Sequence, residues 1–258
     1  MAHARMRILS YELRIDPAPS SLHWQQDPSG NMLARAVLPG PTTTMDVVVD
    51  LVADLSPVDP FDFLIDPGAD TWPFRYEERM ADDLLPFRHP DNPGPKLQAL
   101  RDETGAGPVP TVSLILGLTQ RVRDRVDYIV RMEPGIWPAE TTLSEARGSC
   151  RDSAWLLIQL LRMHGIAARF VSGYLLQVPD DGKPEIADLH AWAEAFLPGA
   201  GWIGLDATSG LMTAEGHIPL AASRDPIAAA PVIGTVEPSG VVLETVMQMR
   251  RAAPSPCL

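Results

Sequence analysis

The chain has 258 residues, 45% of them hydrophobic, which is enough to bury a substantial core in one large domain or two small ones. Its formal net charge of -12 at pH 7 argues against nucleic acid and anionic membranes as partners, because both are bound through clustered lysine and arginine. Residues 1–9 show no secretory signal, and no apolar stretch is long enough to span a bilayer, so we expect a cytoplasmic protein.

Residues 1–55 are expected to form a β-rich region. Between Arg7 and Leu55, β-prone runs alternate with turn residues such as Asp27-Pro28-Ser29-Gly30-Asn31. The pattern predicts about four antiparallel strands, as in a sandwich or half of one. Four strands of roughly six residues are marginal alone, so the region is expected to pack on the rest of the chain.

Residues 56–110 are rich in proline, with ten prolines in the interval. Proline removes a backbone donor and biases the preceding residue away from helix, so long regular elements are not expected here. We interpret the segment as a connector with short helices near residues 81–85 and 96–102.

A core region is predicted over residues 111–235, beginning with two helices. Apolar residues recur at helical spacing from Thr111 to Arg131, which predicts a helix of some five turns. A second helix is predicted from near Ser149 to Gly165, a residue suited to the left-handed conformation after a helix end. Its apolar residues lie nearly all round it, so we expect it to be buried on most sides.

Three strands are predicted after this helix, over residues 168–177, 189–197 and 201–206. The short connection Pro198-Gly199-Ala200-Gly201 predicts a hairpin between the last two. Because alternate residues of a strand share a face, large groups lie on one side of residues 189–197 and alanines on the other, which predicts close packing on both faces. Residues 236–258 are expected to form a C-terminal strand or tail.

Three residues of this core have the chemistry of an activated cysteine nucleophile. Cys150 is at a helix start, where unpaired N–H groups and the helix dipole favour a thiolate. His190 is suited to take and return a proton, and Asp206 to orient the imidazole. Each residue also has an ordinary structural explanation, since a free cysteine is often a small buried hydrophobe. Spacing alone does not choose between these interpretations.

Four segments in order resemble the bacterial transglutaminase-like family of papain-like cysteine enzymes. They are Gly148-Ser149-Cys150-Arg151-Asp152, Gly165-Ile166-Ala167-Ala168-Arg169, Leu189-His190-Ala191-Trp192 and Gly201-Trp202-Ile203-Gly204-Leu205-Asp206. The segments Trp24-Gln25-Gln26-Asp27-Pro28 and Val58-Asp59-Pro60-Phe61-Asp62-Phe63 resemble the β-rich region that precedes the core in such proteins.

The resemblance implies an α+β fold, in which a cysteine helix packs on an antiparallel sheet that carries the histidine and the aspartate. It implies that Cys150 is the nucleophile, His190 the general base and acid, and Asp206 the orienting carboxylate. The Cys150 backbone N–H would be one oxyanion donor. The other candidates for binding the oxyanion or the substrate are Tyr128, Trp137, Gln159 and Trp192, and no motif chooses among them.

The expected reaction is hydrolysis of amide bonds in peptides or proteins through a thioester. One alternative is transglutaminase-type acyl transfer or glutamine deamidation, which shares the acyl-enzyme step, and another is a non-catalytic module that binds peptide or protein. No cofactor is implied. The sequence lacks CxxC and HExxH motifs, so no metal site is expected.

Four other residues receive ordinary interpretations. Arg169, Arg224 and His217 are candidates for lining a substrate groove, but we expect them to be solvated surface residues. A structural disulfide between Cys150 and Cys257 is not expected, because Cys257 lies in a proline-rich tail at the end of the chain.

Overall fold

A five-stranded antiparallel sheet forms the centre of the computed structural model, which describes residues 7–105, 107–177, 185–234, 240 and 242–251. Its strand order is β12-β11-β10-β9-β13. The strands are β9 (Ala168–Gln177), β10 (Ile186–Leu197), β11 (Gly201–Asp206), β12 (Leu211–Met212) and β13 (His217–Ser223). The predicted hairpin between β10 and β11 is present, and the sequence analysis did not predict β12 and β13.

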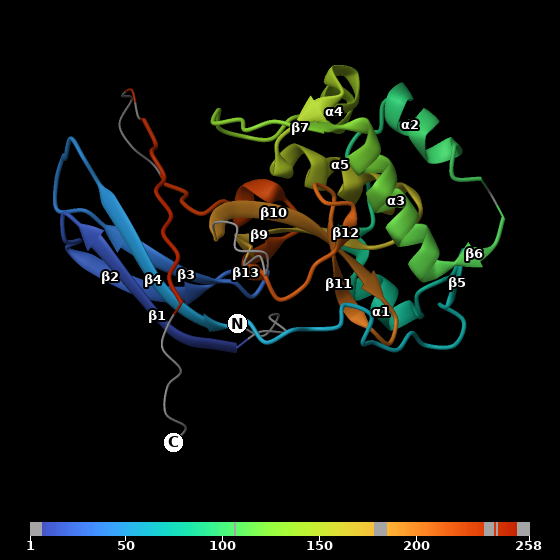
Figure 1. Cartoon of the computed structure of the whole chain (residues 1–258), viewed down its shortest axis with the longest axis horizontal. Helices are drawn as coiled ribbons and strands as arrows, with labels where there is room; N and C mark the ends of the chain where they lie inside the picture. Colours follow the sequence, from blue (N-terminus) through green and yellow to red (C-terminus); the bar gives the residue numbers. More distant parts are fainter. Residues whose placement is uncertain (1–6, 106, 178–184, 235–239, 241, 252–258) are drawn as a thin grey trace.

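Helix α5 (Cys150–Met163) packs on the alanine face of β10, where the alternation of small and large residues predicted close packing. Ala191, Ala193 and Ala195 lie in one buried cluster with the leucines of α5. Small side chains on the strand let the helix approach closely and keep the core at high packing density. Helices α2 (Pro95–Asp102), α3 (Thr111–Arg125) and α4 (Ala139–Glu145) lie around α5 (Figure 1). The α+β fold class is therefore confirmed.

The prediction that the first core helix continues to Arg131 is wrong, because α3 ends at Arg125. Val126 has extended backbone angles, and β7 (Asp127–Tyr128) pairs in parallel with β8 (Arg147–Gly148). The N–H of Ile129 donates to the carbonyl of Gly148 at 3.0 Å. Tertiary pairing thus overrides the helical spacing of the last apolar residues, and it brings this strand beside the start of α5.

The N-terminal region contains four strands, as predicted, at the end of the molecule away from α2 and α3 (Figure 1). They form two antiparallel pairs rather than one sheet, β1 with β4 and β2 with β3. The rings of Tyr11 and Trp24 meet edge to face across the two pairs. The strands are β1 (Arg7–Asp16), β2 (Ser21–Gln26), β3 (Met32–Val37) and β4 (Asp46–Asp54).

The proline-rich connector is short of regular structure, but it is anchored to the core by aromatic side chains. Trp72 Nε1 donates to the carbonyl of His164 at 2.8 Å, and the Tyr76 hydroxyl donates to the carbonyl of Phe196 at 2.8 Å. Its elements are β5 (Thr71–Trp72), α1 (Glu78–Asp83), the 3-10 turn η1 (Leu85–Phe87), α2 and β6 (Val109–Pro110).

The C-terminal part contains the 3-10 turn η2 (Pro226–Ala229). Beyond it, the described residues of the expected strand or tail have no regular secondary structure. Cys257 lies outside the described residues. Every helix in the described ranges is too short or too polar to pass through a bilayer.

Asn31 joins the N-terminal strands to the central sheet. It is 5% exposed, its Nδ2 donates to the carbonyl of Ala222 at 2.9 Å, and its Oδ1 accepts the N–H of Ala222 at 2.8 Å. This side chain therefore satisfies both backbone groups of a residue in the edge strand β13, which is a structural reason for the two parts to stay together.

We predict that Asn31→Ala lowers the free energy of unfolding by about 2 to 3 kcal/mol, because it leaves buried backbone groups of Ala222 without partners. Urea denaturation followed by circular dichroism measures the change. The control is Gln26→Ala on the same hairpin, since the Gln26 hydrogen bond to Gly30 is exposed. Equal effects of the two substitutions would contradict this role for Asn31.

Candidate active site

Cys150 is the first residue of α5 and is partly exposed. The residue before it, Ser149, has the extended backbone of an N-cap. The helix start therefore presents unpaired backbone N–H groups beside the thiol, including that of Cys150 itself. Such groups favour negative charge on the sulfur and on an oxyanion bound next to it.

The carboxylate of Asp152 ties the start of α5 to the loop before it. It accepts the N–H and the hydroxyl of Ser149 at 2.9 and 2.7 Å, and the N–H of Trp137 at 2.8 Å. Arg131 donates to both carboxylate oxygens, from Nε at 3.0 Å and from Nη2 at 2.8 Å. Burial raises the pKa of Asp152, but these donors outweigh it and hold the pKa below its ordinary value. Asp152 is thus a buried, fully paired anion that fixes the backbone around Cys150.

His190 and Asp206 lie on neighbouring strands and meet on one face of the sheet. Strands β10 and β11 are antiparallel with Ala193 opposite Leu205, so Asp206 falls next to the stretch that carries His190. Nε2 of His190 lies 3.2 Å from Oδ1 of Asp206. The two residues are 8% and 2% exposed, so the pair is withdrawn from bulk water.

The charges of this pair are set by its neighbours. Burial lowers the pKa of His190, but the Asp206 carboxylate and the Cys150 thiol outweigh burial and raise it to about 9. Burial likewise raises the pKa of Asp206, but His190, His217 and the N–H of Thr208 together hold it far below its ordinary value. At neutral pH the imidazolium form of His190 is therefore favoured.

A second histidine contacts the same carboxylate. Nε2 of His217 lies 3.4 Å from Oδ2 of Asp206, while its Nδ1 accepts the N–H of Ala214 at 3.3 Å. A neutral imidazole that accepts through Nδ1 carries its proton on Nε2, so His217 is placed to donate to Asp206. Sequence reasoning did not assign His217 to the site.

The same three residues are the candidates for a metal site in the described part of the chain. Ligand atoms of His190, Asp206 and His217 all lie within 4.8 Å of one another. However, a metal ligand needs an unprotonated nitrogen, and the contact with Ala214 places the His217 proton on the nitrogen that faces the group. The arrangement suits proton chemistry better than metal binding.

A short strap, residues 213–217, carries His217 across the sheet from the β11 side to the β9 side. The N–H of Thr213 donates to the carbonyl of Gly204, and the N–H of Leu176 donates to the carbonyl of Gly216. A Cβ at Gly204 would lie 2.0 Å from Oγ1 of Thr213, and one at Gly216 would lie 2.3 Å from the carbonyl oxygen of Leu176. Glycine at both ends therefore allows the strap to lie directly on the sheet.

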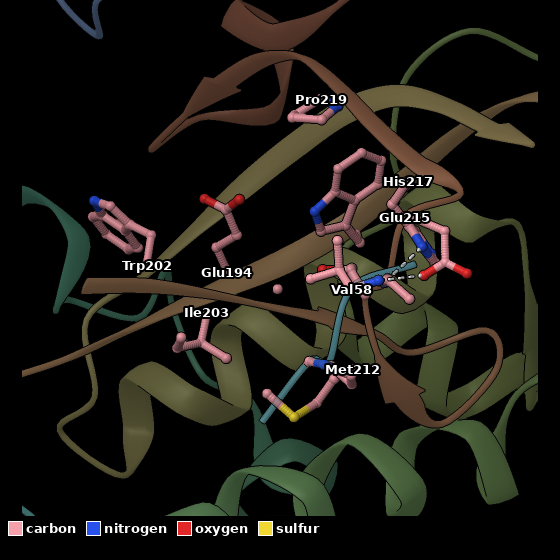
Figure 2. Close-up of a pocket in the computed structure, with 13 residues that line it drawn as sticks. Val58, Glu194, Trp202, Ile203, Met212, Glu215, His217 and Pro219 are labelled. Atoms are coloured by element: carbon pink, nitrogen blue, oxygen red, sulfur yellow. Dashed lines mark hydrogen bonds between the residues drawn. The ribbon is translucent and has the colours of Figure 1, made fainter. Parts of the chain in front are cut away.

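A small cavity of about 60 Å³ lies under the strap, and Figure 2 shows His217 and Glu215 at one end of it and Trp202 at the other. Val58 from the connector closes another side, and its N–H donates to Glu215 at 3.4 Å. The space is sufficient for several water molecules. Its lining includes His217, so the cavity adjoins the groups around Asp206.

Two of the four predicted oxyanion or substrate residues lie beside the cysteine. Tyr128 is exposed on β7, and partial burial together with the charges of Cys150 and Asp206 raises its pKa, so its phenol is close to the triad. Trp137 lies on the loop that Asp152 fixes, with the Arg131 guanidinium 4.9 Å above its ring.

The other two lie elsewhere. Gln159 is nine positions beyond Cys150 on α5, roughly 13 Å along the helix axis, and it accepts the N–H of Asp91 in the connector. It is placed to anchor the connector and not to bind an oxyanion at Cys150. Trp192 is fully buried and stacks on His190, with 6.3 Å between ring centroids, so it supports the histidine from behind.

The expectation that Arg169 and His217 are solvated is wrong. Arg169 is buried, pairs with Glu194 at 2.7 Å, and lies 4.2 Å over the ring of Trp202. Arg224 is half exposed and faces Asp91 at 3.7 Å. The local sequence around these residues does not show that residues 213–217 cross the sheet, or that Glu194 on β10 pairs with Arg169 on β9.

Two protein-family models match parts of this chain. Residues 98–207 match the transglutaminase-like superfamily, and residues 1–54 match the bacterial transglutaminase-like N-terminal region. The chain therefore contains a transglutaminase-like core and a bacterial transglutaminase-like N-terminal region, as its sequence segments indicated. Members of this superfamily are cysteine-based enzymes.

Three individual proteins illustrate what the chain is similar to. An uncharacterized protein of Mycobacterium tuberculosis is 28% identical over 90% of this chain and 77% of its own length. A crystal structure from Cytophaga hutchinsonii, of a protein proposed to be a cysteine protease, has a TM-score of 0.62 and 25% identity over 87% of this chain and 73% of that one. A protein-glutamine gamma-glutamyltransferase of Pseudomonas aeruginosa is 28% identical over 54% of this chain and 22% of its own length.

We predict that Asp152→Asn lowers the free energy of unfolding by about 3 to 5 kcal/mol, because it leaves the buried Arg131 guanidinium without its anion. Chemical denaturation near pH 7 measures the loss. Asp124→Asn removes an exposed carboxylate beside Arg123 and is the matched control, with an expected change within about 0.5 kcal/mol. A similarly small change in Asp152→Asn would show that the pair of Arg131 and Asp152 contributes little to the free energy of unfolding.

The raised pKa of His190 predicts how stability depends on pH. Because its folded-state pKa of about 9 lies above the unfolded value of 6.5, its contribution is fully present below pH 6.5 and is lost as pH rises through 9. The contribution is up to roughly 3 kcal/mol. The unfolding free energies of wild type and His190→Gln should therefore converge between pH 6.5 and 9.5. The exposed His23→Gln is the control, and a difference that stays constant with pH would contradict the raised pKa.

Proposed function

We propose that the protein is a cysteine-dependent amide hydrolase that acts on peptides or proteins through a thioester intermediate. The observation that carries the proposal is the buried contact between His190 and Asp206, 3.2 Å across, beside the Cys150 thiol at a helix start. An imidazolium held in this way stabilises a thiolate nucleophile next to it.

The proposed reaction uses each group in turn. The Cys150 sulfur attacks the amide carbonyl carbon, and the oxyanion is bound by the N–H of Cys150 at the start of α5. His190 gives its proton to the departing amine, which leaves a thioester on Cys150. His190, now neutral, takes a proton from water as the water attacks the thioester, and the acid product leaves with the thiolate restored. Asp206 keeps the imidazole oriented throughout and balances its charge.

We favour hydrolysis over acyl transfer as the fate of the thioester. Cys150 is partly exposed, so water has access to a thioester formed there. The sequence marks no channel for an incoming lysine. The 25% identical Cytophaga hutchinsonii structure, of a protein proposed to be a cysteine protease, also supports this choice.

Acyl transfer from glutamine is the second candidate. It is supported by the Pseudomonas aeruginosa protein-glutamine gamma-glutamyltransferase, which matches 54% of this chain. The thioester is common to the two reactions, and they differ in whether water or an amine attacks it.

One experiment separates the candidates. Wild type and Cys150→Ala are incubated with a mixed peptide library, with and without a labelled primary amine, and the products are read by mass spectrometry. We expect hydrolysis of amide bonds with little amine incorporation, and a loss of at least about a thousandfold in Cys150→Ala. Cys257→Ala, which removes the other cysteine, is the matched control and should retain activity.

Three outcomes would change the proposal. Amine incorporation well above hydrolysis would select acyl transfer. Release of ammonia from glutamine without peptide cleavage would select deamidation. Equal activity in wild type and Cys150→Ala would exclude a cysteine mechanism.

A further inference from the structure

We propose that His217 is a positioning residue for the catalytic groups: it holds the second oxygen of the Asp206 carboxylate, so that the first oxygen stays on His190. The proposal rests on the proposed function, because it assigns a task within that site. Its basis is the contact between Nε2 of His217 and Oδ2 of Asp206, 3.4 Å across, in a region nearly closed to water.

The two oxygens of Asp206 have different partners. Oδ1 accepts the N–H of Thr208 at 2.8 Å and faces His190 at 3.2 Å. Oδ2 faces His217, whose side chain is 12% exposed. A buried carboxylate with donors on one oxygen only is free to turn about its last bond, whereas donors on both oxygens fix its plane. His217 therefore completes the set of contacts that orients Asp206.

The imidazole of His217 is itself fixed. Its Nδ1 accepts the N–H of Ala214, which directs the proton on Nε2 toward Asp206. Its ring meets Trp192 edge to face, with 5.3 Å between centroids and an interplanar angle of 83°. The strap that carries it lies directly on the sheet at Gly204 and Gly216. A donor held in place in this way needs little reorganisation when it binds the carboxylate.

Charged groups face His217 on two sides. On one side it faces Asp206 and, 5.8 Å away between ring centroids, His190, which carries the positive charge of the site. On the cavity side Glu215 and Glu194 line the same space (Figure 2). Glu194 is already paired with Arg169.

More distant groups complete the electrostatic surroundings of Asp206. Partial burial raises the pKa of Tyr128, and so do the charges of Cys150, Asp188 and Asp206, so Tyr128 lies within electrostatic reach of all three. The titration of His190 therefore has to be compared between variants that leave all of these groups unchanged.

The test compares donor-free and donor-retaining substitutions. His217→Phe keeps an aromatic ring against Trp192 but removes the donor, and His217→Gln retains an N–H at nearly the position of Nε2. In His217→Phe we expect kcat for peptide hydrolysis to fall about tenfold with KM unchanged, as for a hydrogen bond lost to a charged group. The alkaline limb of the pH profile should move to lower pH by about one unit, because a looser Asp206 stabilises the imidazolium less. In His217→Gln, both kcat and the alkaline limb should return most of the way to their wild-type values.

A second readout does not depend on the substrate. The rate at which iodoacetamide alkylates Cys150, followed by mass spectrometry of its peptide, reports the pairing of thiol and imidazole. We expect it to fall about fivefold at pH 7 in His217→Phe and to recover in His217→Gln. His217→Met is a second donor-free variant in case His217→Phe does not fold, and His23→Phe on exposed β2 is the control.

Every outcome decides the question. Wild-type profiles in both donor-free variants would overturn the proposal, and so would equal losses in His217→Phe and His217→Gln, which would indicate packing alone. If wild type cleaves no peptide but its alkylation responds as expected, the positioning role stands and the proposed function fails. If wild type cleaves peptide and neither readout responds to the donor, the proposed function stands and the positioning role fails.

Discussion

A buried carboxylate that is ionised at neutral pH is the constraint on which the site depends. Asp206 is almost without contact with water, and an isolated carboxylate in such a place would take up a proton. Donors on both of its oxygens keep it charged, and its charge keeps His190 an imidazolium. The position of Cys150 is useful only beside an imidazole in that state, because the thiolate is the nucleophile.

Three parts of the fold hold the charged groups of the site in place. The β10–β11 hairpin places His190 and Asp206 on one face of the sheet. On the helix side, the buried pair of Arg131 and Asp152 holds the loop before α5 against its first turn. The strap crosses the sheet from the remaining side and brings His217 to Asp206. Each support satisfies its buried charges locally, so the core tolerates a concentration of polar groups that would otherwise destabilise it.

Much of this arrangement was predictable from the sequence. The largely apolar helix after Ser149 and the alternating strand around His190 each have a regular period that indicates which faces are buried, and turn residues predict the hairpin before Asp206. The N-terminal strands followed from turn residues at regular spacing. The family segments then linked Cys150, His190 and Asp206, although they lie far apart along the chain.

The features that were not predicted depend on contacts between segments far apart in the sequence, and local sequence patterns do not indicate such contacts. The apolar spacing from Thr111 predicted helix through Arg131, but pairing of β7 with β8 ends it at Arg125. Gln159 has the amide of an oxyanion donor, yet its place on α5 directs it to the connector. The spacing of Ser149 and Asp152 is that of a capping box, so it could have predicted the hydrogen bonds between these two residues. No comparable spacing in the sequence predicts the contact of His217 with Asp206.

The protonation state of His190 tests the account most directly. Nitrogen NMR of histidine-labelled protein, recorded from pH 6 to 10 and assigned with His190→Gln, distinguishes an imidazolium from a neutral ring. We expect both ring nitrogens of His190 to remain protonated at neutral pH and to titrate near pH 9. A neutral ring at pH 7 that titrates at or below 6.5 would show that burial outweighs Asp206 and Cys150, and would contradict the account.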